Sequence, residues 1–292
     1  MYTVDKMSVT SATGDAPTRH VPWARVVAVG VIAGFTSGLF GVGGGIVIVP
    51  LLGLLAAFPH KLATGTSLTA IVPISVAGIA GYATAGEIDW AAAACVTAGA
   101  VAGTLAGTRW LVRISPGVLQ VAFAAAMVLT ALKMFVDDGD AGGRAGLTLA
   151  TGLALVALGL ASGVLAGLLG VGGGILIVPV LGLAFGLPHV VAKGTSLAVI
   201  LPTALIGTAR NRRSQLTALG PAATVGVAGM ASAFAASKLS IDLDPAVSRT
   251  LFAALLMAVA ARLAHTGLAT RHADRPRSAR EAAARPGGTG DA

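Results

Sequence analysis

Charged and aromatic side chains are both scarce in this chain of 292 residues. Only 11% of the residues are charged and 4% are aromatic, whereas 55% are hydrophobic. A soluble core of this size would show amphipathic helices with a charged face, and the long apolar segments carry no such face. The scarcity of charge therefore excludes an ordinary soluble domain. It predicts helices that cross a lipid bilayer, each of about 20 apolar residues.

Acidic residues are absent from every apolar segment, and cysteine is nearly absent from the chain. A carrier of protons or sodium ions usually binds its cation with a carboxylate inside the membrane. The lack of such a carboxylate therefore favours an anionic or neutral substrate. The single cysteine, Cys95, excludes a disulfide within the chain.

The sequence also lacks the motifs of common enzymes and cofactor sites. It contains no Walker lysine after a GxxxxG loop, no HExxH and no CxxC. Its GVGGG motif has the first glycines of a dinucleotide loop, but Ile46 and Ile175 replace the third glycine and no βαβ pattern surrounds them. We therefore expect no enzymatic activity, no cofactor and no metal site.

The net charge of +8 does not indicate binding to nucleic acid. The basic residues lie in short loops and in an arginine-rich C-terminal tail, not on a folded surface with interleaved aromatic residues. Loop charges of this kind set the orientation of a membrane protein. The expected partners are membrane lipid and a small anionic substrate, with no nucleic acid. The sequence is also compatible with a homo-oligomer.

An internal duplication is the most informative pattern. Residues 41–50 read GVGGGIVIVP and residues 170–179 read GVGGGILIVP, an offset of 129 residues. The same offset relates residues 65–68 to residues 194–197, which both read GTSL. A unit of about 120 residues has therefore been duplicated.

The duplication divides the chain into two repeats with a tail at each end. From N- to C-terminus we predict a disordered tail at 1–20, membrane repeat 1 at 21–137, a linker loop at 138–149, membrane repeat 2 at 150–265 and a disordered basic tail at 266–292.

The glycine-rich motif interrupts the first apolar segment of each repeat. Read as one helix, residues 26–58 would be about 50 Å long, whereas the hydrocarbon core is about 30 Å thick. The glycines and the nearby Pro50 also disfavour an unbroken helix. We therefore predict two half-length helices joined at the break, as either a re-entrant hairpin or two short crossings.

The fold class that follows is an all-α polytopic membrane protein with about 8–10 membrane segments. It has two inverted-topology repeats, each with a Gly-broken helix pair and three spanning helices. The predicted segments are 26–40, 46–58, 62–85, 91–108 and 118–136 in the first repeat, and 155–169, 175–187, 190–209, 219–237 and 247–264 in the second.

Loop charges orient these segments. With both termini in the cytoplasm, most basic loop residues lie inside and the acidic loops lie outside, as the positive-inside rule requires. The repeats are then inverted relative to each other. The fitting residues are Lys61, Arg109, Arg113, Arg210, Arg212 and Arg213 inside, and Glu87, Asp89, Asp137, Asp138 and Asp140 outside, whereas Arg144, Lys193 and Lys238 do not fit.

The two breaks are the first candidate binding site. Inverted repeats with broken helices are typical of secondary transporters, which bind their substrate near the membrane midplane. A half-helix that begins after the glycines presents free N–H groups and a positive dipole end, which suits an oxyanion. Alternatively, the glycines serve only for packing. The six candidates are Gly43, Gly44 and Gly45 in the first repeat and Gly172, Gly173 and Gly174 in the second.

Other glycines lie four residues apart on single helices, which predicts close helix packing. These series are Gly30, Gly34 and Gly38; Gly99, Gly103 and Gly107; and Gly159, Gly163 and Gly167.

The paired GTSL segments are the second candidate. The hydroxyls of Thr66, Ser67, Thr195 and Ser196 either donate to a ligand or bond back to the preceding helical turn. Lys193 stands in the second repeat where the first has Thr64. It either extends to the membrane interface or supplies the counter-charge for an anion.

With these elements in place, a family resemblance is visible. GVGGGIVIVPLL and GVGGGILIVPVL, each followed by PH-x-x-A-x-GTSL, together with GEIDW at 86–90, resemble the TauE/SafE family of sulfite exporters. The resemblance covers roughly residues 24–265. It implies a bacterial inner-membrane permease for sulfite, an organosulfonate or another small organic acid. The second repeat departs from the pattern because it lacks GEIDW and carries Lys193, so any site is expected to be asymmetric.

The function predicted from the sequence is a secondary transporter for a small anion, working by alternating access between the inverted repeats. The alternative is a non-transporting membrane scaffold or a subunit of a partner complex.

Overall fold

The described part of the chain is a bundle of helices. The structure, a computed structural model, describes residues 23–110, 124–125, 127–132, 146, 148–169, 172–213, 217–262 and 264, and no β-strand occurs among them. The first repeat forms α1 (Trp23–Phe40), α2 (Gly45–Ala56), α3 (His60–Ala83) and α4 (Trp90–Trp110). The second forms α6 (Leu149–Leu169), α7 (Gly174–Phe185), α8 (His189–Arg213) and α9 (Leu219–Asp242), followed by a helix at Pro245–Arg262.

Helix length and composition confirm an all-α polytopic membrane protein. Among the described residues, five helices are long and apolar enough to cross a membrane: α1, most of α3 and α8, α9 and Pro245–Arg262. The helices α2 and α7 have only 12 residues each. At about 1.5 Å per residue each is about 18 Å long, so neither crosses a core of about 30 Å by itself. The predicted tails and the acidic loop at 137–140 lie outside the described residues.

The helix break occurs where the sequence predicts it, in both repeats. The last residue before each short helix is a glycine in the left-handed conformation: Gly44, with φ of 72°, precedes α2, and Gly173, with φ of 76°, precedes α7. Residues with a side chain rarely adopt this conformation, so glycine is required at both positions. Residues 41–44 and 170–173 are named the first break and the second break below.

The chain folds back on itself after the first break. The guanidinium Nη1 of Arg25, near the start of α1, is 3.5 Å from the carbonyl oxygen of Leu55, near the end of α2. At the other end, a Cβ on Gly44 would lie 2.8 Å from the carbonyl oxygen of Ala33. The pair α1–α2 is therefore a hairpin. In the second repeat, a Cβ on Gly173 would lie 2.8 Å from the carbonyl oxygen of Ser162, the residue equivalent to Ala33.

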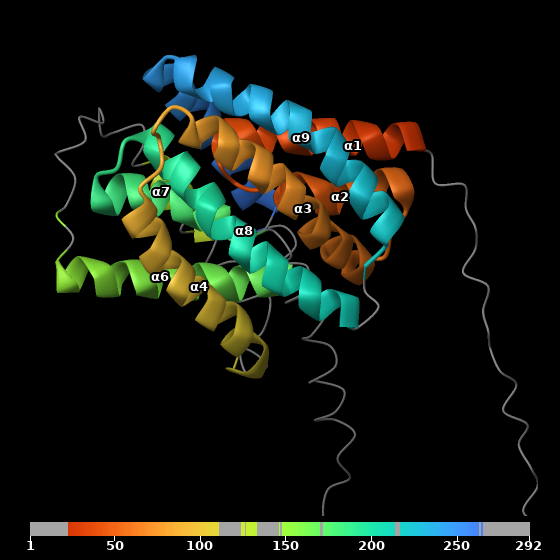
Figure 1. Ribbon diagram of the computed structural model, residues 1–292, viewed down its shortest axis with the longest axis horizontal. Coiled ribbons are helices and arrows are strands. Elements are labelled where there is room, and N and C mark those ends of the chain that lie inside the picture. Colours follow the sequence, from red (N-terminus) through yellow and green to blue (C-terminus); the bar gives the residue numbers. More distant parts are fainter. Residues whose placement is uncertain are drawn as a thin grey trace, which may run out of the picture.

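The two repeats exchange their fourth helices. Figure 1 shows α9, from the second repeat, lying along α1, from the first, and the equivalent helix α4 packs against α6. Each pair is parallel, because contacts advance in the same direction along both helices. The backbones touch where glycines recur: Gly30 faces Val225, Gly34 faces Gly229 and Gly38 faces Ala233, while Gly99 and Gly159 face Val156 and Val96, and Gly103 and Gly163 face Leu160 and Ala100. The predicted glycine packing is therefore observed at these positions, and the side-chain surroundings of Gly107 and Gly167 lie outside the described residues.

Two packed units result from this exchange. The first unit contains α1, α2, α3 and α9, and the second unit contains α6, α7, α8 and α4. The buried hydrophobic residues form two clusters, and each cluster also includes residues of the other unit, such as Phe40 of α1 in one and Ile200 of α8 in the other. The units meet where α3 crosses α8.

The crossing of α3 and α8 is antiparallel and two-fold symmetric. Leu197 lies against Gly78, and its equivalent Leu68 lies against Gly207. Residues later in α3 therefore contact residues earlier in α8. An approximate two-fold axis that relates the repeats must therefore lie perpendicular to these helices.

Candidate functional site

The first break meets the start of α7 where the two units touch. A Cβ on Gly174, the first residue of α7, would lie 2.9 Å from the carbonyl oxygen of Gly41 and 2.9 Å from Cα of Val42. All six candidate glycines of the breaks are buried. The first N–H groups of a helix have no partner within the helix and carry its positive dipole end. The structure therefore places the positive end of α7 against the first break, which leads directly into the positive end of α2.

Two buried isoleucines lie against these breaks, and the sequence analysis did not single them out. Ile71 on α3 and Ile200 on α8 are separated by the repeat offset of 129 residues. A Cβ on Gly43 would lie 3.0 Å from Cγ2 of Ile200 and 3.6 Å from Cγ2 of Ile71. The sequence feature that could have identified them is their position two residues before Pro73 and Pro202. The apolar segments around them are otherwise ordinary.

The threonines of the GTSL segments connect the repeats. Oγ1 of Thr66 accepts a hydrogen bond of 3.1 Å from the backbone N–H of Ala218, just before α9. Oγ1 of Thr195 accepts one of 2.9 Å from the backbone N–H of Asp89, just before α4. Neither acceptor bond matches the two alternatives drawn from the sequence, a ligand or the preceding turn. A helix start leaves amides without helical partners, and the exchange of α4 and α9 places these amides beside the opposite repeat's threonine.

The two serines of the GTSL segments are fully buried. Among the described residues, Oγ of Ser196 has no hydrogen-bond partner. A buried hydroxyl without a partner is costly, because it has lost its bonds to water. Ser196 therefore keeps an unused donor and acceptor in the second unit.

Lys193, one turn into α8, is buried within the protein, with only 1% of its surface exposed. Its Nζ donates to Oγ of Ser240, at 2.9 Å, and to Oγ of Ser248. Ser240 in turn donates to the carbonyl oxygen of Leu39, near the C-terminus of α1. A cation here is stabilised by the negative dipole end of that helix. No carboxylate within the described residues pairs with it.

The backbone of Lys193 lies directly against the first break. A Cβ on Gly41 would be 2.6 Å from both Cα and the carbonyl oxygen of Lys193. The first repeat has Thr64 at the equivalent position, and Oγ1 of Thr64 has no partner among the described residues. The predicted asymmetry of the site is therefore present in its charge.

The two broken hairpins, doubled by an offset of 129 residues, carry the motifs by which the chain can be compared with known proteins. The family described as sulfite exporter TauE/SafE matches residues 3–134 and 155–290. The chain belongs to the TauE/SafE family. Together with the five helices of the described part that are long and apolar enough to cross a membrane, this membership makes it a multi-pass membrane transporter.

Several relatives of this TauE/SafE protein carry the name probable membrane transporter protein. YunE of Bacillus subtilis (strain 168) is 28% identical over 208 residues, which cover 62% of this chain and 75% of the relative. A protein of Xylella fastidiosa (strain 9a5c) is 30% identical over 191 residues, which cover 64% of this chain and 73% of the relative. A third, from Methanocaldococcus jannaschii, is 52% identical over 56 residues, 19% of this chain and 21% of the relative. No solved structure matches the chain significantly.

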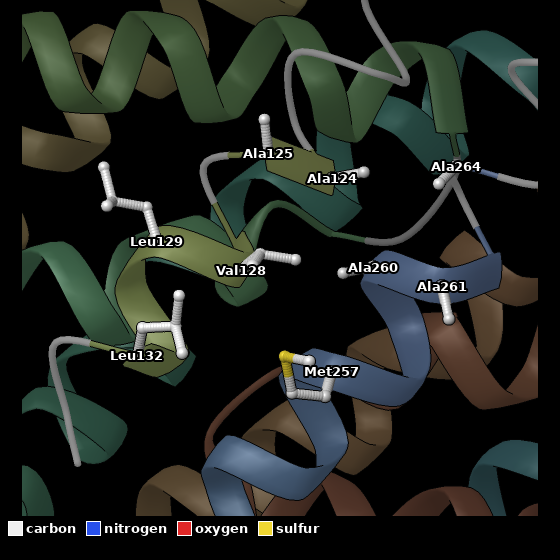
Figure 2. Close-up of a pocket in the computed structure, with 9 residues that line it drawn as sticks. All are labelled: Ala124, Ala125, Val128, Leu129, Leu132, Met257, Ala260, Ala261 and Ala264. Atoms are coloured by element: carbon white, nitrogen blue, oxygen red, sulfur yellow. The ribbon is translucent and has the colours of Figure 1, made fainter.

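A separate pocket of the TauE/SafE protein does not suit an anion. It has a volume of about 530 Å³ and lies between residues 124–132 and the helix Pro245–Arg262 (Figure 2). Its lining consists of alanine, valine, leucine and methionine side chains. An anion would lose its hydration there without gaining a hydrogen-bond donor from these side chains. The breaks therefore remain the candidate site.

Proposed function

We propose that this TauE/SafE protein is a secondary transporter that moves a small anion by alternating access between its two packed units. The observation that carries the proposal is the contact of the positive end of α7 with the first break, which leads directly into the positive end of α2. Free N–H groups at such ends bind oxyanions without any charged side chain. Sulfite, organosulfonates and small organic acids are the substrate class that fits.

The charges around the breaks support an anion over a cation. The buried Lys193 is next to the first break, and the described residues offer it no carboxylate partner. A substrate cation at this place would meet the positive ends of α2 and α7, and the negative end of α1 already interacts with the Lys193 ammonium through Ser240. We assign the amides of Gly43, Gly44 and Gly45 and of Gly172, Gly173 and Gly174 to the substrate, with Ser196 and Lys193 as supporting donors.

The hydroxyls of the other GTSL residues have a lesser part in this proposal. Thr66 and Thr195 accept hydrogen bonds from Ala218 and Asp89, and each hydroxyl can still donate its own hydrogen. Ser67 stays a candidate because it is fully buried at the place equivalent to Ser196.

The antiparallel crossing of α3 and α8 supports inverted repeats. If α3 runs from inside to outside, α8 runs from outside to inside, and the two-fold axis between them lies in the membrane plane. Inverted repeats of this kind allow two equivalent conformations that open the site to opposite sides. The loop charges favour both termini in the cytoplasm, and the proposed location is a bacterial inner membrane.

Counterflow in proteoliposomes tests the function directly. Vesicles preloaded with sulfite, an organosulfonate or a small carboxylate are diluted into a trace of the same labelled anion. We expect saturable uptake of at least one of these anions, with competition by the others and none by organic cations. Folded protein that takes up none of them would instead support a scaffold role.

A further inference from the structure

Ile71 and Ile200 fill the space where a substrate would meet the helix ends. Both are fully buried. A Cβ on Gly172 would lie 3.2 Å from Cγ2 of Ile200 and 3.8 Å from Cδ1 of Ile71, and a Cβ on Gly174 would lie 2.5 Å from Cδ1 of Ile200. Together with the contacts at Gly43, each isoleucine therefore reaches both breaks.

We propose that Ile71 and Ile200 form an apolar gate, which closes the site between α2 and α7 and must withdraw before an anion binds. This inference rests on the proposed function. An anion gains nothing from an isoleucine side chain, and burying it against one without hydrogen bonds is costly. The structure thus shows the closed form, with the gate seated on the glycines.

The helices that carry the gate have a built-in point of flexibility. Pro73 and Pro202 lie inside α3 and α8, two residues beyond the isoleucines. A proline inside a helix removes one backbone hydrogen bond and permits a bend. Bending at these prolines, or sliding of α3 along α8, moves each isoleucine relative to the breaks. Because α3 and α8 belong to different units, relative motion of the units opens the gate.

The two isoleucines are not equivalent in their contacts. Ile200 is within 3.2 Å of positions built on Gly43, Gly172 and Gly174, whereas Ile71 is 3.6 Å or farther from those on Gly43 and Gly172. Shortening Ile200 therefore opens more of the gate than shortening Ile71. A longer side chain at residue 200 presses on both breaks and blocks them.

Cysteine reactivity tests the gate without relying on transport. Val42 lies in the first break and is fully buried, so Val42→Cys in a Cys95→Ala background reports access to the space between the breaks. With Ile71→Ala and Ile200→Ala added, we expect reaction with a small thiosulfonate to be about tenfold faster or more, where tenfold corresponds to about 1.4 kcal/mol.

A matched control separates the gate from general loosening of the core. Ile48 and Ile177 are another pair of buried isoleucines at equivalent places, on α2 and α7. Their double alanine variant creates similar cavities but leaves Ile71 and Ile200 seated. Equal acceleration in the two double variants would overturn the gate. If the gate variant does not fold, Ile71→Val with Ile200→Val gives the same test. We then expect a smaller acceleration of labelling, with Ile200→Val still contributing more than Ile71→Val.

Transport measurements distinguish failure of the gate from failure of the proposed function. In counterflow, we expect Ile200→Ala to admit larger organic anions than the unmodified protein and Ile200→Phe to abolish uptake. Uptake that is unchanged in both variants would overturn the gate but remain consistent with the proposed transport function. Faster cysteine labelling in the gate variant, in a protein that transports no anion, would support the gate and overturn the proposed transport function.

Discussion

The hydroxyl oxygen of Thr66 accepts a hydrogen bond from the backbone N–H of Ala218, 152 residues further along the chain. Its counterpart joins Thr195 to the N–H of Asp89, over 106 residues. Each bond ties the start of α3 or α8 to the start of the fourth helix of the other repeat. The two bonds are equivalent under the repeat offset, so they secure the exchange of α4 and α9 on both sides of the molecule.

Removing either threonine hydroxyl should destabilise the fold. Thr66→Val or Thr195→Val leaves a backbone N–H without its acceptor, at a cost of about 1–3 kcal/mol, whereas Thr→Ser should retain most of the stability. Thermal unfolding in detergent measures the difference. Thr203→Val is the control, because among the described residues this buried hydroxyl bonds only to carbonyls of its own helix, at Val199 and Ile200. A loss as large in Thr203→Val would contradict a specific role for the bonds between repeats.

The repeated motifs made part of this fold predictable. The breaks at Gly44 and Gly173 follow from local chemistry, because several glycines and a nearby proline disfavour a continuous helix in any surroundings. The glycines of α1, such as Gly34, predict a close helix contact because their spacing places them on one face. The fold class follows from the same patterns.

The partners of these elements could not be predicted from the sequence. Apolar spacing shows that Gly34 faces a helix, but nothing in it selects α9 of the other repeat over α4 of its own. The bond from Ala218 to Thr66 depends on that exchange and was therefore missed. Ile71 and Ile200 were missed for another reason: an isoleucine in an apolar segment looks like any core residue until its contacts are known.

The glycine contact between α1 and α9 should tolerate no added methyl group. A Cβ on Gly34 would overlap the carbonyl oxygen of Gly229, so Gly34→Ala must push the helices apart, at a cost of about 1–3 kcal/mol. On α6, a Cβ on Gly152 would meet nothing within 4 Å. Gly152→Ala should therefore be neutral or stabilising by about 0.5–1 kcal/mol, because alanine favours the helix. Equal melting temperatures of the two variants would contradict the observed packing.

Inverted repeats with both termini in the cytoplasm require the two acidic loops to lie outside the cytoplasm. Single cysteines in a Cys95→Ala background report this in intact cells, through labelling by an impermeant thiol reagent. We expect labelling at Glu87→Cys and Asp138→Cys, and protection at Lys61→Cys and Arg113→Cys, because basic loops stay inside. Protection at residue 138 combined with labelling at residue 113 would overturn the inverted arrangement.

Lys193 should contribute to anion affinity. Lys193→Gln removes the buried charge next to the first break, and we expect weaker apparent binding by about 1–3 kcal/mol in proteoliposomes. Lys193→Arg should retain some uptake with altered selectivity, since a planar guanidinium holds an oxyanion differently from a compact ammonium. Lys238→Gln is the control, because Lys238 of α9 donates an exposed hydrogen bond to Oγ1 of Thr84, the residue that follows α3. Reduced thermal stability with unchanged affinity in Lys193→Gln would assign the lysine to the C-terminus of α1 alone.

The glycines of the breaks should be essential to transport for a reason beyond backbone strain. Gly44→Leu or Gly173→Leu places a side chain at the start of a half-helix and against the carbonyl oxygen of Ala33 or Ser162, so we expect uptake to be abolished while membrane insertion persists. Any side chain at these left-handed positions also strains the backbone. Gly86 supplies the matched control, because it has φ of 76° and a Cβ there would meet nothing within 4 Å. Gly86→Leu carries the same kind of strain in a turn outside the breaks, so it should lower stability but retain uptake. An equal loss of uptake in Gly86→Leu would show that backbone strain alone explains the effect at Gly44. Full uptake in both break variants would show that those glycines serve only for packing.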